Sequence, residues 1–258
     1  VQTRRSQLAA YETELGVTLA VAFVRGKLRN QKHQLQYGGK YLKATAPERF
    51  ERLTRKIEVL ANLRKQLVGF TGDRLDAIRD RLMGYEGTGA RVYWEGVAIL
   101  LEGRIPFPGR IGRGAVDPVN SAFNYGYSIL YGRVSAAIAN AGLEQFAGFL
   151  HVDRPGKPSL VLDLVEEFRA PIVDRVVLAM MNQGEYSVPV RKNISLAALV
   201  YWLHLLRASA SEGETFQGFS SARFLKRAFC SSLVMSSQIL TTMPPSCSSI
   251  QSMVRRLA

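Results

Sequence analysis

Apolar residues recur at helical spacing through segment after segment of this chain. The first such run extends from Arg5 to Gln36 and stops at Gly38 and Gly39, which predicts one long helix. Nowhere do strand-like and helix-like patterns alternate, and the sequence contains no internal repeat. We therefore predict a mainly α fold, a multi-helix domain.

Local start and stop signals divide the remainder of the chain into further helices. Asp117 before Pro118 is a good N-cap and first-position pair, whereas Pro171 should break or kink the helix that contains it. Between the helices, residues 103–114 form a loop rich in Gly and Pro, and residues 151–158 form a polar turn. Further helices are expected over residues 45–69, 73–83, 90–101, 117–142, 160–181 and 190–208.

The charge of the chain indicates a nucleic-acid partner. Its 258 residues include 34 Lys and Arg against 21 Asp and Glu, a net charge of +13. Such a protein attracts polyanions and gains affinity by releasing their counterions. An anionic membrane surface is a competing partner, but no apolar run approaches the roughly 20 residues of a spanning helix. Only Cys230 and Cys247 are present, so no disulfide framework is expected and a cytoplasmic location is favoured.

Ionisable residues gather around one histidine, His151, in the block of residues 149–169. If the second half of this block is helical, Asp163, Glu166 and Glu167 stand at positions i, i+3 and i+4, with two or three carboxylates near one face. Carboxylates this close repel one another, so a divalent cation or an arginine should offset them. Oxygen donors with one imidazole favour Mg²⁺ or Mn²⁺. The alternative is a capped helix with a solvated acidic face.

A series of motifs resembles the CRISPR-associated spacer-acquisition integrase, the Cas-one family. The matching segments share the family's order and approximate spacing, and the resemblance covers roughly residues 4–190. They are residues 24–31 (VRGKLRNQ), 82–95 (LMGYEGTGARVYWE), 117–131 (DPVNSAFNYGYSILY), 142–143 (GL), 148–151 (GFLH) and 162–169 (LDLVEEFR).

The resemblance implies a metal-dependent DNA endonuclease and integrase. Its metal ligands and catalytic residues would be Glu95, His151 and Glu166, with Asp163 as a supporting group or alternate ligand and Glu167 facing away. It also implies a catalytic domain over residues 1–190, followed by a helical extension with an atypical Ser-rich end over residues 191–258. The family's N-terminal β-rich domain is expected to be absent from this chain.

Partners and DNA contacts follow from the same resemblance. Two subunits, bridged by the small Cas-two protein, would insert short foreign DNA into a repeat array by attack of a 3′-hydroxyl on a phosphodiester. The substrate would be double-stranded or branched DNA, and a homodimer is expected for full-length members. Candidate DNA-binding residues near the site are Arg91, Asn120, Tyr125, Arg154, Lys157 and Arg169.

Other interpretations of the same residues stay open. Glu95 could be an exposed glutamate beside the buried aromatic residues Tyr93 and Trp94, and Glu86 is interpreted as a helix-start residue. The whole chain could be a non-catalytic basic helical module that binds nucleic acid, or a metal-dependent DNA nuclease that works outside any CRISPR array. Retained metal binding would exclude the pure binding module.

Overall fold

The described residues form a helical protein, which confirms the predicted mainly α class. The computed structural model describes residues 1–72 and 74–182, and this part of the chain contains helices and loops but no strand. The helices are α1 (Gln2–Tyr11), α2 (Glu14–Gly38), α3 (Leu42–Thr45), α4 (Pro47–Gln66), α5 (Leu75–Leu101), α6 (Pro118–Asn140), α7 (Ser159–Phe168), the π-helical turn η1 (Arg169–Asp174) and α8 (Arg175–Asn182).

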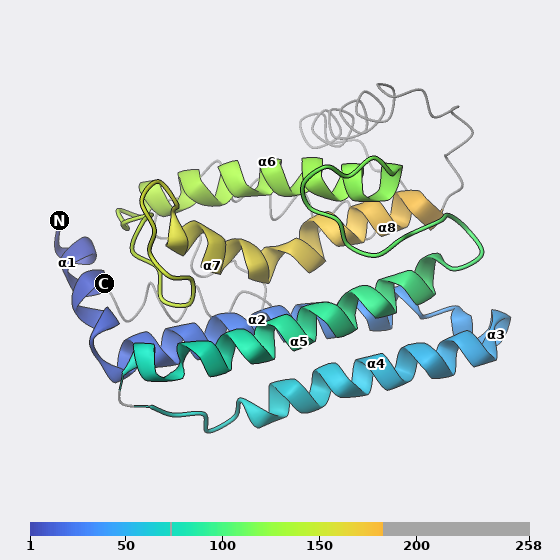
Figure 1. Cartoon of the computed structure of the whole chain (residues 1–258), viewed down its shortest axis with the longest axis horizontal. Helices are drawn as coiled ribbons and strands as arrows, with labels where there is room; N and C mark the ends of the chain where they lie inside the picture. Colours follow the sequence, from blue (N-terminus) through green and yellow to red (C-terminus); the bar gives the residue numbers. More distant parts are fainter. Residues whose placement is uncertain (73, 183–258) are drawn as a thin grey trace, which may run out of the picture.

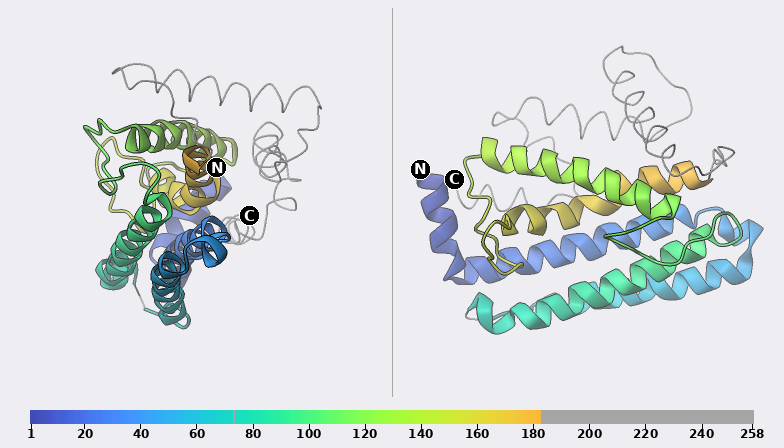
Figure 2. Two further views of the ribbon diagram at one scale, coloured as in Figure 1. Left: turned by 90° about the vertical axis from the view of Figure 1, so that its right-hand side faces the viewer. Right: turned by 45° about the horizontal axis from the view of Figure 1, so that its top comes forward.

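The helix α2 packs against two groups of helices, which form two layers. Helices α4 and α5 run beside α2 in one layer, and α6, α7 and α8 form the other (Figures 1 and 2). The inward face of α2 contributes Phe23, Leu28 and Leu35, each 1% exposed or less. Each fully buried side chain of this size contributes about 1.5–3 kcal/mol, so α2 serves both layers as a shared core.

The expected single first helix is two helices with a sharp corner between them. Thr13 accepts a hydrogen bond from the backbone N–H of Leu15 (3.3 Å) and donates one to the carbonyl of Ala10 (2.9 Å), so it ends α1 and caps α2. A Cβ at Gly16 would lie 2.7 Å from the Ala10 carbonyl oxygen. The prediction was wrong here because apolar spacing continues through the corner while a capping threonine redirects the backbone.

The two short helices expected at residues 73–83 and 90–101 are one continuous helix, α5. Residues 84–89 join the two expected segments, and Gly89 lets α5 approach α2 so closely that a Cβ there would clash with Leu28. Close packing therefore compensates the low helix propensity of glycine. The N-cap prediction for α6 is confirmed, since Asp117 accepts a hydrogen bond from the N–H of Asn120 (2.8 Å) and Pro118 is the first helical residue.

Pro171 perturbs its helix as expected. The α7 helix changes at Arg169 into the wider π-helical turn η1, and regular α-helix resumes at Arg175. Proline lacks the N–H that an α-helical bond requires at this position. The helix expected over residues 190–208 lies outside the described residues. Among the described helices, none combines the length and apolarity needed to cross a membrane.

Candidate metal and DNA site

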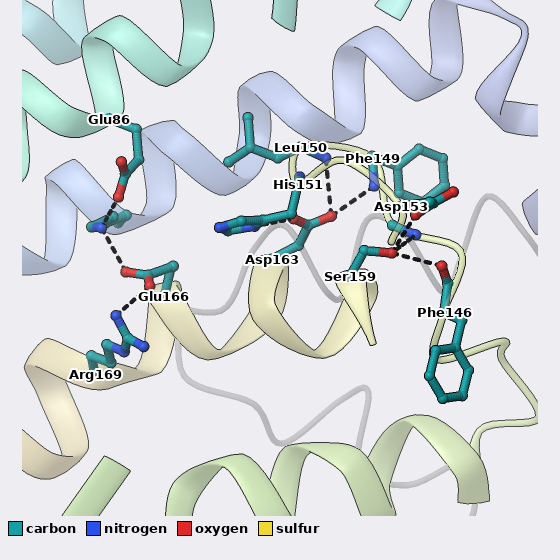
Figure 3. Close-up of polar contacts among 12 residues, drawn as sticks. Glu86, Phe146, Phe149, Leu150, His151, Asp153, Ser159, Asp163, Glu166 and Arg169 are labelled. Carbon is teal, nitrogen blue, oxygen red and sulfur yellow. Dashed lines mark hydrogen bonds and ion pairs between the residues drawn. The ribbon is translucent and has the colours of Figure 1, made fainter. Parts of the chain in front are cut away.

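Asp163 organises the loop that carries His151. It is fully buried on α7, and its Oδ2 accepts the backbone N–H groups of Phe149 (2.7 Å) and Leu150 (3.0 Å). Its Oδ1 accepts the N–H of His151 (2.9 Å) and lies 2.7 Å from Nδ1 of the same residue (Figure 3). Both oxygens are thus occupied by the loop, so Asp163 is placed to orient His151 and not to bind a metal itself.

The ring of His151 has one nitrogen available for a ligand. Because Asp163 Oδ1 accepts the proton of Nδ1, the neutral ring carries its lone pair on Nε2. The side chain is 20% exposed, and its ring extends toward Glu166 (Figure 3). This carboxylate–histidine pair is a common arrangement behind protein metal ligands.

The serine that begins α7 fixes the other end of the loop. Ser159 Oγ accepts the N–H of Gly148 (2.8 Å) and lies 2.7 Å from the Phe146 carbonyl and 2.5 Å from Asp153 Oδ1. Its single proton serves one of these two acceptors at a time. A Cβ at Gly148 would lie 2.7 Å from the backbone of Ser159, so glycine is required for this approach.

Two carboxylates from different helices meet on Lys27. Glu86 of α5 and Glu166 of α7 point toward each other (Figure 3), and the buried Lys27 of α2 forms ion pairs with both, at 2.5 Å for Glu166 Oε2. Arg169 pairs with the other oxygen of Glu166. Burial raises the pKa of Glu166, but Lys27 and Arg169 outweigh burial and hold that pKa below its ordinary value. Burial lowers the pKa of Lys27, and the charges of Glu166 and Glu86 more than reverse this.

Glu95, which the sequence suggested as a metal ligand, lies on the opposite side of α5. Nine residues separate it from Glu86, two and a half helical turns and roughly 13 Å along the axis. Its carboxylate is 37% exposed and pairs with Lys56 (2.6 Å) and Arg91 (2.6 Å). The hydrogen bond from Lys56 is the main cause that lowers the pKa of Glu95. The structure therefore brings Glu86 and Glu166 together on Lys27, whereas Glu95 is paired with Lys56 and Arg91 away from them.

Glu86 is the residue that the sequence interpretation missed. It was taken for a helix-start residue, yet it stands in the middle of α5, which begins eleven residues earlier at Leu75. Glu167, expected to face away from the site, is fully buried and lies against Gly26 of α2. A signal for Glu86 was present in the sequence, because position 86 lies on the face of α5 that carries Leu82, Gly89 and Tyr93 into the core.

The predicted DNA-binding residues fall into different environments. Asn120 is fully buried, and its amide donates to the Gly109 carbonyl (2.8 Å) and accepts from Ile111 N–H (2.9 Å), so it anchors the 102–117 loop and presents no face to DNA. Arg91 forms an ion pair with Glu95. Arg154 and Lys157 are exposed in the turn before α7, and Tyr125 is partly exposed on α6. Of this set, only Arg169 contacts a residue of the candidate site.

A second buried polar cluster lies beside Arg169. Asp174, 1% exposed, accepts hydrogen bonds from the hydroxyls of Tyr93 (2.7 Å) and Tyr127 (2.5 Å). The guanidinium of Arg169 lies 4.7 Å from the centre of the Tyr127 ring, and that of Arg110 lies 5.2 Å from it. Burial raises the pKa of Asp174 despite the hydrogen bonds from both tyrosines. Residues from α5, α6 and η1 thus meet where α7 changes helical form.

The donor chemistry around His151 suits a hard divalent cation. Two carboxylates and one imidazole nitrogen are ligands that Mg²⁺ and especially Mn²⁺ accept. Within residues 1–72 and 74–182, no three His, Cys, Asp or Glu side chains are already arranged to hold a metal ion. Lys27 lies between two of the candidate ligands, and Glu166 Oε2 accepts no well-directed hydrogen bond. The residues fit a metal provided that the Lys27 ammonium moves aside.

Comparison with known families shows a match over most of the chain. The family model described as CRISPR associated protein Cas1 matches residues 1–190. The CRISPR-associated endonuclease Cas1 1 of Archaeoglobus fulgidus is 39% identical over 187 residues, covering 70% of this chain and 54% of that protein. The protein of the same name from Thermus thermophilus is 40% identical over 185 residues, covering 70% and 49%. The chain spans about half the length of these relatives.

Solved structures share the fold at lower sequence identity. A Cas1 protein from Thermotoga maritima has a TM-score of 0.61 at 20% identity, covering 88% of this chain and 68% of that one. A casposase bound to integration product has a TM-score of 0.60 at 22% identity, covering 89% and 63%. The family match over most of the chain and the identity to curated relatives agree, and the chain belongs to the Cas1 family.

Proposed function

We propose that this chain is the metal-binding helical part of a DNA endonuclease and integrase, with Glu86, His151 and Glu166 as the metal ligands. One observation carries the proposal: the carboxylates of Glu86 and Glu166 converge from separate helices, close to a histidine whose Nδ1 is held by Asp163. We assign Glu86 in place of Glu95, because Glu95 faces the other way on α5 and pairs with Lys56.

The surrounding side chains would position DNA and the ligands. A bound Mg²⁺ or Mn²⁺ supplies Lewis-acid activation of a phosphodiester and of the attacking hydroxyl or water. Asp163 holds the His151 ring in the orientation and tautomer that exposes Nε2. Arg169, three residues after Glu166 at the start of η1, pairs with that carboxylate and holds it in place. We propose Mn²⁺ as the better-fitting ion, since it accepts an imidazole more readily than Mg²⁺ does.

The family membership extends the proposal to substrate and partners. Curated relatives are named endonucleases, and structural neighbours include a casposase bound to integration product and a Cas6-RT-Cas1–Cas2 complex with a TM-score of 0.64 at 18% identity, covering 95% of this chain and 26% of that chain. We infer that the chain acts on double-stranded or branched DNA in the cytoplasm, with a Cas2 partner and a second Cas1 subunit. The match over residues 1–190 supports placing the catalytic domain there, with residues 191–258 as an extension.

Strand transfer and cleavage of a branched DNA substrate test this proposal. Activity should require Mn²⁺ or Mg²⁺ and vanish with a chelator. Glu86→Gln, His151→Ala and Glu166→Gln should each lower activity by at least roughly 100-fold while DNA affinity changes little. Glu95→Gln is the matched control on the same helix, and we expect it to retain activity within a few-fold.

The opposite pattern of variants would return the ligand role to Glu95. If Glu95→Gln abolishes activity and Glu86→Gln does not, our assignment on α5 is wrong. DNA binding without metal binding in any of the proteins would identify a non-catalytic nucleic-acid-binding module. Cleavage of branched DNA together with no transfer into a repeat substrate would favour a nuclease that works outside CRISPR arrays.

A further inference from the structure

We propose that the ammonium of Lys27 occupies the position of the metal between Glu86 and Glu166 when no metal is bound. A divalent ion and Lys27 then compete for the same two carboxylates. The inference rests on the proposed function, because it takes these carboxylates as ligands. It gives a role to Lys27, a residue of the matching segment 24–31 that is not itself one of the proposed ligands.

The contacts of Lys27 show why the two cations exclude each other. Its Nζ forms ion pairs with one oxygen of Glu86 and one of Glu166 at the same time. A Mg²⁺ ion bound by carboxylates lies about 2.0–2.1 Å from their oxygens. Two cations cannot both occupy the small volume that contacts these oxygens, and their like charges repel strongly in a poorly solvated place. Loading of the metal therefore requires Nζ to leave.

Burial explains why a cation is needed when the metal is absent. The side chains of Lys27, Glu86 and Glu166 are 7%, 16% and 11% exposed. Two carboxylates facing each other with so little water strongly disfavour being ionised together unless a positive charge lies between them. Lys27 meets this need from α2, the helix against which both α5 and α7 pack.

The lysine side chain is suited to such an exchange. It is a point charge on a flexible stem with several rotatable bonds, whereas arginine holds carboxylates in a rigid fork. Arg169, which pairs with the other oxygen of Glu166, can remain in place when Lys27 moves. The net charge between Glu86 and Glu166 then rises by one unit, because the metal carries two positive charges and the lysine that it replaces carries one.

Lys27→Met tests the inference, since methionine keeps most of the length of the side chain and removes its charge. The matched control is Lys56→Met, because Lys56 contacts Glu95 at 2.6 Å and its removal releases a carboxylate outside the site. Mn²⁺ affinity would be measured by electron paramagnetic resonance of the free ion and by calorimetry. We expect Lys27→Met to bind Mn²⁺ at least about tenfold more tightly than the wild type, and Lys56→Met to bind it equally.

Thermal unfolding in chelator and in excess Mn²⁺ keeps the test informative if Lys27→Met is unstable. We expect this variant to melt earlier than the wild type in chelator and to recover the wild-type midpoint with Mn²⁺. Equal destabilisation under both conditions, or Mn²⁺ affinity no tighter than that of the wild type, would overturn the inference and leave Lys27 a structural residue. If neither protein binds Mn²⁺, the proposed function fails together with it.

Discussion

Replacing Asp163 by Asn removes half of the acceptors that hold the His151 loop. The carboxylate receives four hydrogen bonds, two at each oxygen, and the amide of Asn retains one oxygen. If the NH₂ group faces Phe149 and Leu150, two buried N–H donors lose their acceptor; if it faces His151, the backbone N–H of His151 loses its acceptor and the ring can accept a hydrogen bond at Nδ1. Each unsatisfied buried donor costs about 1–3 kcal/mol, so the variant should lose about 2–6 kcal/mol in the first orientation and about 1–3 kcal/mol in the second. This is a large part of the roughly 5–15 kcal/mol that stabilises a domain.

The same change acts on the tautomer of His151. If the retained oxygen stays with Phe149 and Leu150, the new NH₂ donates to His151 Nδ1, and the ring proton moves to Nε2. Nε2 of His151, the nitrogen that we propose binds the metal, is then protonated. We expect Mn²⁺ affinity to fall by about 10–100-fold, the usual effect of losing a group that orients a metal-binding histidine.

Urea denaturation and Mn²⁺ titration would measure both effects. The urea concentration at the midpoint of unfolding should fall. The slope of the unfolding free energy against urea concentration should stay constant, since a loss of stability alone leaves that slope unchanged. Asp153→Asn is the control, because Asp153 lies 2.5 Å from Ser159 Oγ in the same loop and takes no part in the hydrogen bonds between Asp163 and His151. A stability loss under about 1 kcal/mol for Asp163→Asn would refute the reasoning about its four hydrogen bonds.

Two other perturbations address groups outside the metal site. Burial raises the pKa of Asp174 above its ordinary 3.8. In the pH range between the unfolded and the folded pKa, the native state therefore keeps a proton on Asp174 that the unfolded state loses. The contribution of this group to the free energy of unfolding falls as pH rises through that range. Asp174→Asn should remove that part of the pH dependence in urea denaturation from pH 4 to 7; an unchanged profile would contradict it. Burial and the nearby Arg25 and Arg29 lower the pKa of Arg64, which indicates accumulated positive charge between α2 and α4. Arg64→Gln should therefore reduce the salt slope of DNA binding by about one unit, and an unchanged slope would place DNA elsewhere.

Local signals predicted the fold where one residue decides the backbone. Asp117 and Pro118 determine the start of α6, and Pro171 distorts its helix, because capping and the missing N–H act within a turn. The continuity of α5 through Gly89 was not predicted, because this glycine admits Leu28 of α2, a helix distant in the sequence. Propensity alone cannot show that a glycine is required by packing. Thr13, by contrast, carried a capping signal that the apolar periodicity concealed.

The site was only partly predictable for a related reason. His151, Asp163 and Glu166 lie within sixteen residues, and helical spacing brings the carboxylates together. The choice between Glu86 and Glu95 depends on which face of α5 meets α2. Leu82, Gly89 and Tyr93 mark the buried face that carries Glu86, but the sequence does not show which helix packs against that face. Lys27 and the cluster of Tyr93, Tyr127 and Asp174 join residues from separate helices. Contacts of this range exist only after the helices have packed.

The π-helical turn lets the second layer accommodate a change of one residue in the length of the chain. A π turn accommodates one residue more than the α turn it replaces, and here it lets α7 present Glu166 while Asp174 still reaches Tyr127. Deleting one residue from 169–174 would allow a regular helix to form straight through. Because the wider turn absorbs the extra residue, the helix beyond the deletion would keep nearly its present orientation relative to α7. A one-residue deletion in the middle of α6 would instead rotate the rest of that helix by about 100°, so residues 169–174 should tolerate the loss of one residue better than α6 does.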